Sequence, residues 1–187
     1  MHVVTVQGVQ IPALGLGTFR LDGDVAGRMV TYALDIGYRH IDTAQMYGNE
    51  AEIGAAIERS PVPRDQIFLT TKVWPDQFRD GALQRSVEVS VQKLRTEPDL
   101  LLLHWPNPAV PLAETMAALN QVKRRGMTKH IGISNCTTAL IERSLELTEE
   151  QLLVNQVEYH PYLGQQAVLA TLRAHDMALT AYSPIAQ

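Results

Sequence analysis

The chain has 187 residues, of which 45% are hydrophobic and 19% are charged, so it can bury a core and is not typical of a disordered protein. A formal net charge of −4 without any basic stripe argues against a nucleic-acid partner or an anionic membrane surface. The single cysteine, Cys136, excludes a disulfide framework within the chain.

The N-terminal segment lacks the charged leader and long apolar core of a signal peptide. The longest leucine run, LLLL at 100–103, is far too short to cross a bilayer. We therefore expect a cytoplasmic protein.

Strand-like segments recur along the chain. Residues 3–12 (VVTVQGVQIP) predict a small hairpin that turns at Gln7 and Gly8. Several of the later segments are near-continuous apolar runs, as is typical of parallel strands covered on both faces. Seven strands are predicted after the hairpin, at 13–18, 38–44, 67–74, 99–105, 130–135, 152–159 and 177–183.

Segments with helical periodicity separate these strands. In the first of them, Val25, Met29, Ala33 and Ile36 lie on one predicted helical face, and Gly37 marks the end of the helix. Alternating strands and helices predict an α/β fold built from repeated βα units.

Two α/β architectures compete. GLG at 15–17 resembles half of a dinucleotide-binding fingerprint, but the third glycine is replaced by Arg20 and no helix pattern follows directly. The alternative is a (β/α)8 TIM barrel, which typically has about 250 residues. We predict one barrel domain over residues 1–187 with an N-terminal β-hairpin. It would be incomplete at its C-terminus, with seven strands represented and the eighth strand and last helices missing.

Polar side chains gather where the predicted strands end. In a (β/α) barrel the active site forms at the C-terminal ends of the strands. We expect one shared site that includes the loop residue Tyr47, although its members are far apart in sequence. The strands themselves contribute Asp42, Lys72, His104, Ser134, Asn135, Gln156, Tyr182 and Ser183.

Four of these side chains form a coherent chemical set. A tyrosine has an ordinary pKa of about 10, too high for efficient proton transfer near neutrality. A nearby lysine ammonium would lower that pKa, an aspartate would hold the lysine, and a histidine could orient a carbonyl oxygen. These residues could protonate a carbonyl oxygen while a hydride is transferred to the carbonyl carbon. Since no side chain donates hydride, a nicotinamide cofactor must supply it.

The motifs GLGTFR, DTAQMYGNEAEIG, TTKVW, LLLLHWP, IGISN, NQVEYHPY and AYSP occur in this order along the chain. Together they resemble the aldo-keto reductase superfamily, above all its bacterial 2,5-diketo-gluconate and methylglyoxal reductase members. The resemblance covers essentially the whole chain. It implies a (β/α)8 barrel that reduces aldehydes and ketones with NADPH.

The resemblance also implies roles for single residues. Tyr47 would be the general acid, Lys72 and Asp42 its activating pair, and His104 the residue that orients the substrate carbonyl. The substrate pocket would be lined by Tyr47, His104, Phe19, Trp74 and Trp105. The cofactor would be held by Gly17, Thr18, Asp42, Ser134, Asn135, Gln156, Tyr182 and Ser183.

The chain departs from the family pattern at two places. Cys136 stands where a phenylalanine is common, which should alter packing behind the nicotinamide site. The family segments that hold the cofactor's pyrophosphate and 2′-phosphate follow the seventh and eighth strands, and the sequence does not contain them. We therefore expect the catalytic part of a reductase without its cofactor clamp.

Two other functions stay open. Lys72 could be the nucleophile of a Schiff-base aldolase, because lysines at barrel strand ends can serve in this way. The chain could also be a nucleotide-binding regulatory member of the same fold without turnover. The histidines show no zinc-binding spacing, so we expect no metal site. The expected partner is a small-molecule carbonyl substrate, and we expect a monomer.

Overall fold

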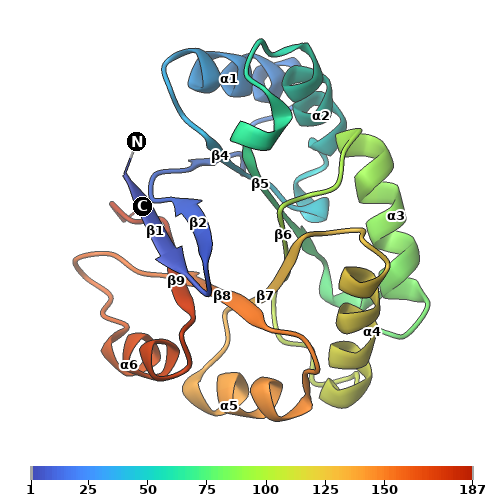
Figure 1. The fold of residues 1–187 in the computed structure, drawn as a ribbon, viewed down its shortest axis with the longest axis vertical. Coiled ribbons are helices and arrows are strands. Elements are labelled where there is room, and N and C mark those ends of the chain that lie inside the picture. Colours follow the sequence, from blue (N-terminus) through green and yellow to red (C-terminus); the bar gives the residue numbers. More distant parts are fainter. Residues whose placement is uncertain (1, 187) are drawn as a thin grey trace.

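A computed structural model describes residues 2–186. The chain begins with the predicted hairpin, strands β1 (Val3–Val6) and β2 (Val9–Pro12), which pair antiparallel. Gln7 and Gly8 form the turn with positive φ angles. The Gln7 side chain donates hydrogen bonds to the carbonyl oxygens of Leu152 and Asp176, next to the starts of two later strands. The hairpin therefore covers the N-terminal end of the barrel (Figure 1).

Seven parallel strands form the barrel, and each lies beside the next one in the sequence. This consecutive order confirms the barrel prediction and excludes the strand order of a dinucleotide-binding fold, which reverses at its middle. Within residues 2–186 the first and last strands do not pair with each other, so the barrel is nearly closed. The strands are β3 (Leu16–Gly17), β4 (His40–Asp42), β5 (Phe68–Val73), β6 (Leu100–Leu103), β7 (His130–Ser134), β8 (Leu152–Glu158) and β9 (Ala178–Tyr182).

Six helices within the described residues surround these strands on the outside (Figure 1). They are α1 (Asp24–Asp35), α2 (Glu50–Arg59), α3 (Ala82–Leu94), α4 (Leu112–Arg124), α5 (Thr138–Leu147) and α6 (Gln166–Ala174). Three short 3₁₀ turns, η1 (Gln45–Tyr47), η2 (Arg64–Gln66) and η3 (Pro75–Gln77), lie in the loops. None of the helices within the described residues is long and apolar enough to cross a membrane.

The predicted buried face of α1 is right at Ala33, which is buried, but the other predicted positions are wrong. Val25, Met29 and Ile36 are exposed, whereas the buried side chains of this helix are Ala26, Val30, Ala33 and Leu34. Both sets have helical spacing, so periodicity alone could not separate them. The buried set begins with a smaller residue, which suits the close packing of α1 against α2.

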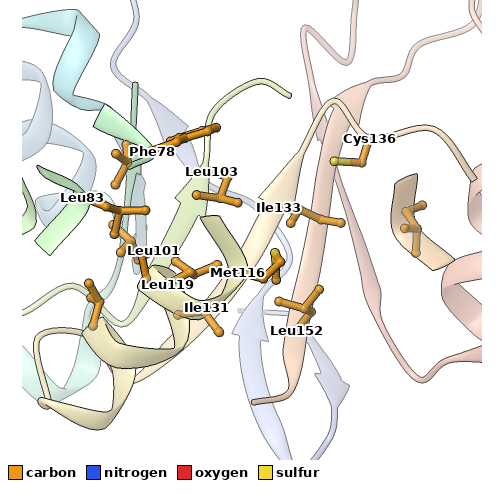
Figure 2. Close-up of a cluster of buried hydrophobic side chains, with 14 of the residues drawn as sticks. Phe78, Leu83, Leu101, Leu103, Met116, Leu119, Ile131, Ile133, Cys136 and Leu152 are labelled. Carbon is orange, nitrogen blue, oxygen red and sulfur yellow. The ribbon is translucent and has the colours of Figure 1, made fainter. Parts of the chain in front are cut away.

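Side chains of successive strand residues point alternately out of and into the barrel. The outward residues of β6 and β7 pack against α3 and α4, where Met116 and Leu119 of α4 meet Leu101 and Ile131 (Figure 2). The inward set includes Leu100 and Leu102 of β6, which pack with Val6 and Ile11 of the hairpin to close the barrel floor.

This alternation also determines where the polar side chains lie. In the strand register, Asp42 pairs with Thr70, and Lys72 pairs with the inward-facing Leu102. Residues paired across neighbouring strands point to the same side, so all four side chains face the barrel interior. Asp42 and Lys72 are the last inward positions of β4 and β5. Their charged groups therefore lie above the apolar floor, at the C-terminal end of the barrel.

Candidate active site

A cavity of about 880 Å³ opens at the C-terminal end of the barrel. Most of the predicted site residues line it, and the structure thus brings together positions spread over the whole chain. Lys72 and Trp74 do not reach its wall and lie behind it. The predicted residues that line the cavity are Gly17, Thr18, Phe19, Asp42, Tyr47, His104, Trp105, Ser134, Asn135, Gln156, Tyr182 and Ser183.

Lys72 is the centre of the charged group, and only 1% of its surface is exposed. Its Nζ donates to Asp42 Oδ1 at 2.5 Å, to the Thr43 carbonyl oxygen at 2.8 Å and to the Tyr47 hydroxyl at 3.3 Å. All three ammonium donors therefore have acceptors, which a buried charge requires. The contacts join β4, β5 and η1 at one point.

The Tyr47 ring lies between Phe19 and His104, with ring centroids 5.1 Å and 5.7 Å away. This burial raises the pKa of Tyr47 above its ordinary value, and the nearby Lys72 ammonium offsets only part of the rise. Lys72 lowers the pKa of Tyr47 as predicted, but desolvation of the phenolate outweighs this attraction. Tyr47 is fully protonated near neutral pH and can act as a proton donor.

His104 directly follows the last residue of β6 and is buried beside the rings of Tyr47 and Trp74. Burial, with a further contribution from Lys72, lowers its pKa to about 4. Its Nδ1 has no hydrogen-bond partner among residues 2–186. His104 is thus a neutral imidazole with free hydrogen-bonding capacity at the cavity.

The low pKa of His104 predicts that the protein loses stability in mild acid. The unfolded histidine takes up a proton below about pH 6.5, whereas the folded one resists protonation down to about 4, so stability is complete above pH 6.5 and falls as the pH drops toward 4. Urea unfolding of the parent and of His104→Phe at pH 7 and pH 5 measures this. The variant should lose less stability between pH 7 and pH 5. Part of the loss remains, because burial also lowers the pKa of His40. Equal losses in both proteins would contradict the prediction.

The amide side chains form a second hydrogen-bonded group. Asn135 has a left-handed backbone conformation directly after β7, with φ 59°. Its Nδ2 donates to the His104 carbonyl oxygen, and its Oδ1 accepts from the Tyr182 hydroxyl. Ser134 Oγ donates to the Gln156 carbonyl oxygen at 2.8 Å. Gln156 Nε2 donates to Asp42 Oδ2 at 2.7 Å and so connects this group to Lys72 and Tyr47.

This wall fits the carboxamide of a nicotinamide. A carboxamide needs both donors and acceptors, and the Ser134, Asn135 and Gln156 side chains offer both at the cavity. Gln156 Oε1 accepts no hydrogen bond from another residue within 2–186, so it can receive one from a ligand. The described residues contain no group of three or more histidine, cysteine or acidic side chains that could bind a metal ion.

Sequence reasoning missed several residues of the cavity wall. Leu14, Met46 and Glu158 line it, and Leu14 and Met46 are exposed. Met46 stands directly before Tyr47 in the same turn, and this adjacency could have revealed it. Trp74, expected in the substrate pocket, instead supports the His104 ring edge-to-face at 5.2 Å.

Comparison with known proteins gives consistent matches over nearly the whole chain. A family model described as the aldo/keto reductase family matches residues 13–187. Methylglyoxal reductase DkgB of Escherichia coli O157:H7 is 46% identical over 180 residues, which are 94% of this chain and 67% of that protein.

Solved structures agree with this match. A protein proposed to be a 2,5-diketo-D-gluconic acid reductase B has a TM-score of 0.94 and 53% identity, over 97% of this chain and 65% of that one. An aldo-keto reductase of Bombyx mori in complex with NADP has a TM-score of 0.91 and 30% identity, over 98% of this chain and 66% of that one. The chain spans about two thirds of the length of these relatives.

Proposed function

The chain belongs to the aldo/keto reductase family, and from this we propose that it takes part in the NADPH-dependent reduction of aldehydes or ketones to alcohols. The observation that carries the proposal is the Lys72 ammonium held between Asp42 and the Tyr47 hydroxyl at the cavity wall. The bound NADPH would supply a hydride to the carbonyl carbon.

Tyr47 is the proton donor for the carbonyl oxygen. The oxygen gains negative charge as its carbon is reduced, and the Tyr47 hydroxyl then transfers its proton to it. The phenolate that remains faces the Lys72 ammonium 3.3 Å away, which stabilises it more strongly than the neutral tyrosine. Asp42 keeps Lys72 charged and fixed in place.

The neutral His104 orients the substrate. A ring nitrogen that carries hydrogen can donate to the carbonyl oxygen without adding a full charge to the cavity, because the low pKa keeps the ring uncharged. Phe19, Met46 and Trp105 are exposed at the cavity and would contact the carbon chain of the substrate. Their apolar surfaces favour carbonyl compounds with a hydrophobic substituent.

The cofactor would lie against the opposite wall. Ser134, Asn135 and Gln156 would bind the nicotinamide carboxamide, and the Tyr182 ring would stack on the nicotinamide. Gly17, Thr18 and Ser183 border the same cavity and would contact the neighbouring ribose. Support comes from the matching hydrogen-bond chemistry of the amide group and from the relative in complex with NADP.

The contacts of Lys72 argue against a Schiff-base aldolase. An amine must lose its proton before it attacks a carbonyl. Lys72 Nζ donates to three acceptors, one of them a carboxylate, and these contacts hold the nitrogen away from any carbonyl that it would have to attack.

A turnover assay tests the proposal and separates it from a regulatory role. The purified chain is mixed with NADPH and with methylglyoxal or an aromatic aldehyde, and the loss of the absorbance of reduced nicotinamide is followed. We expect consumption that requires both the chain and the aldehyde, faster with NADPH than with NADH. Binding of NADPH without consumption would identify a nucleotide-binding protein instead. If the chain neither binds nor consumes NADPH, the proposal is overturned.

A further inference from the structure

A group of polar side chains outside the barrel lies behind Tyr47, and the reaction described above does not use it. Its members come from four elements that pack against one another: Gln45 of η1, Glu50 of α2, Thr71 of β5, and Ser86 and Ser90 of α3. We call these five residues the Gln45 network.

Gln45 uses both ends of its side chain in this network. Its Nε2 donates to Ser90 Oγ at 3.0 Å and to the Ser86 carbonyl oxygen at 3.1 Å. Its Oε1 accepts a hydrogen bond from the Trp74 backbone N–H at 3.2 Å. A single side chain thus connects the turn that carries Tyr47 with α3 and with the end of β5.

Glu50 completes the network in a buried position, with 2% of its surface exposed. Its carboxylate accepts from Thr71 Oγ1 at 2.7 Å and from Ser90 Oγ at 3.3 Å. No ion pair involving Glu50 is found within residues 2–186, and burial raises its pKa. A carboxyl group is costly to bury in this way, and stability alone would be served more simply by an apolar residue.

The network holds both partners of the proton-donating pair. Gln45 and Tyr47 are the first and last residues of η1, so fixing one side chain fixes the turn. Thr71 precedes Lys72 directly in β5, and Trp74 follows the end of that strand two residues after Lys72. The Lys72–Tyr47 contact of 3.3 Å lies at the long end of hydrogen bonding, so a small displacement would break it.

We propose that Gln45 is a positioning residue, which holds the Tyr47 hydroxyl within hydrogen-bond reach of Lys72 by joining η1 to the end of β5 and to Ser90. The inference rests on the proposed reduction for its consequence in turnover, but the placement of Tyr47 can be measured without turnover. This positioning role also explains why the Gln45 network keeps polar side chains at the buried contact between η1, α2 and α3.

The first measurement is the titration of Tyr47 in Gln45→Leu. The charged and titratable groups that face Tyr47 are Lys72, Asp42, His104 and Tyr182, and Lys72 is the one that lowers its pKa most. If the hydroxyl moves away from Lys72, the pKa of Tyr47 rises. Tyrosine labelled with ¹³C at the ring carbon that bears the hydroxyl reports this pKa, and the Tyr47 signal is the one lost in Tyr47→Phe.

Gln77→Leu is the matched control, since Gln77 lies in the neighbouring η3 turn and its side chain, within residues 2–186, donates only to the adjacent Asp76 side chain. We expect the Tyr47 titration to move to higher pH in Gln45→Leu and to stay in place in Gln77→Leu. In the turnover assay, kcat should fall about 10- to 100-fold in Gln45→Leu, because small misplacements of reacting groups are costly. NADPH binding should be unchanged, which a general loss of folding would not allow.

Two outcomes separate the inference from the proposed function. A shifted titration in a chain without turnover would support the positioning role and count against the reductase proposal. An unshifted titration together with parental kcat in Gln45→Leu would overturn the inference and leave the reductase proposal intact. If Gln45→Leu does not fold, Ser90→Ala breaks the same link to Glu50 and must shift the titration in the same direction.

Discussion

Replacing Tyr47 with phenylalanine is expected to lower the turnover of carbonyl reduction by roughly 10²- to 10⁴-fold, the usual contribution of a general acid. The substitution removes one hydroxyl and keeps the ring that packs between Phe19 and His104. The carbonyl oxygen then has no proton donor among the residues placed beside it, since His104 is neutral and Lys72 lies behind the cavity wall. Steady-state kinetics with saturating NADPH measures the loss.

Tyr162→Phe is the matched control for this experiment. Tyr162 is 88% exposed and lies outside the cavity, so the loss of its hydroxyl should leave turnover unchanged. Circular dichroism and NADPH binding should be parental in both variants. Near-parental reduction by a folded Tyr47→Phe protein would contradict the role assigned to Tyr47.

Replacing Lys72 with methionine is expected to damage both catalysis and folding. The Tyr47 phenolate loses the ammonium that stabilises it, so the pKa of Tyr47 should rise further and turnover should fall at least as far as in Tyr47→Phe. The substitution also leaves the Asp42 carboxylate without its cation. Breaking a buried ion pair on one side costs about 3–5 kcal/mol, and urea unfolding at pH 7 should show a loss of this size.

Lys129→Met provides the comparison for stability. Lys129 is mostly exposed, and its partner Asp99 keeps a second cation in Arg64. Asp99 is buried but keeps Arg64, and the Lys129 side chain lies in solvent, so its loss should cost only about 0–1 kcal/mol and this variant should be nearly as stable as the parent. Adding Asp42→Asn to Lys72→Met should recover part of the lost stability, since it removes the unpaired charge. A Lys72→Met protein with parental stability and turnover would contradict this interpretation.

Much of the architecture could be predicted from the sequence because parallel strands in a barrel have a strong local signature. All seven predicted strands and the hairpin appear as strands at the predicted places in the sequence, several of them shorter than predicted. The site residues followed from one rule, that barrel sites form at the C-terminal ends of strands. Asp42, His104, Ser134 and Tyr182 could therefore be assigned to one cavity without knowledge of any contact.

Other features depend on three-dimensional packing that no local pattern encodes. The apolar residues of α1 fit two helical faces, and packing against α2 and against strands β4 and β5 decides between them. The pKa of Tyr47 reflects a balance between burial and the Lys72 charge, and the sequence reveals only the charge. The bonds of Gln45 join segments about 30 to 45 residues away, which made its role invisible in the sequence.

We infer that this cavity transfers a hydride from NADPH to a carbonyl carbon while Tyr47 protonates the oxygen. The most direct measurement uses NADPH that carries deuterium at both hydrogen positions of C4 of the reduced nicotinamide, with an aromatic aldehyde as substrate. Mass spectrometry of the product from the parent chain should show one deuterium on the alcohol carbon. The same labelled alcohol should form roughly 10²- to 10⁴-fold more slowly with Tyr47→Phe. An alcohol without deuterium, or equal rates from the two proteins, would contradict the claim.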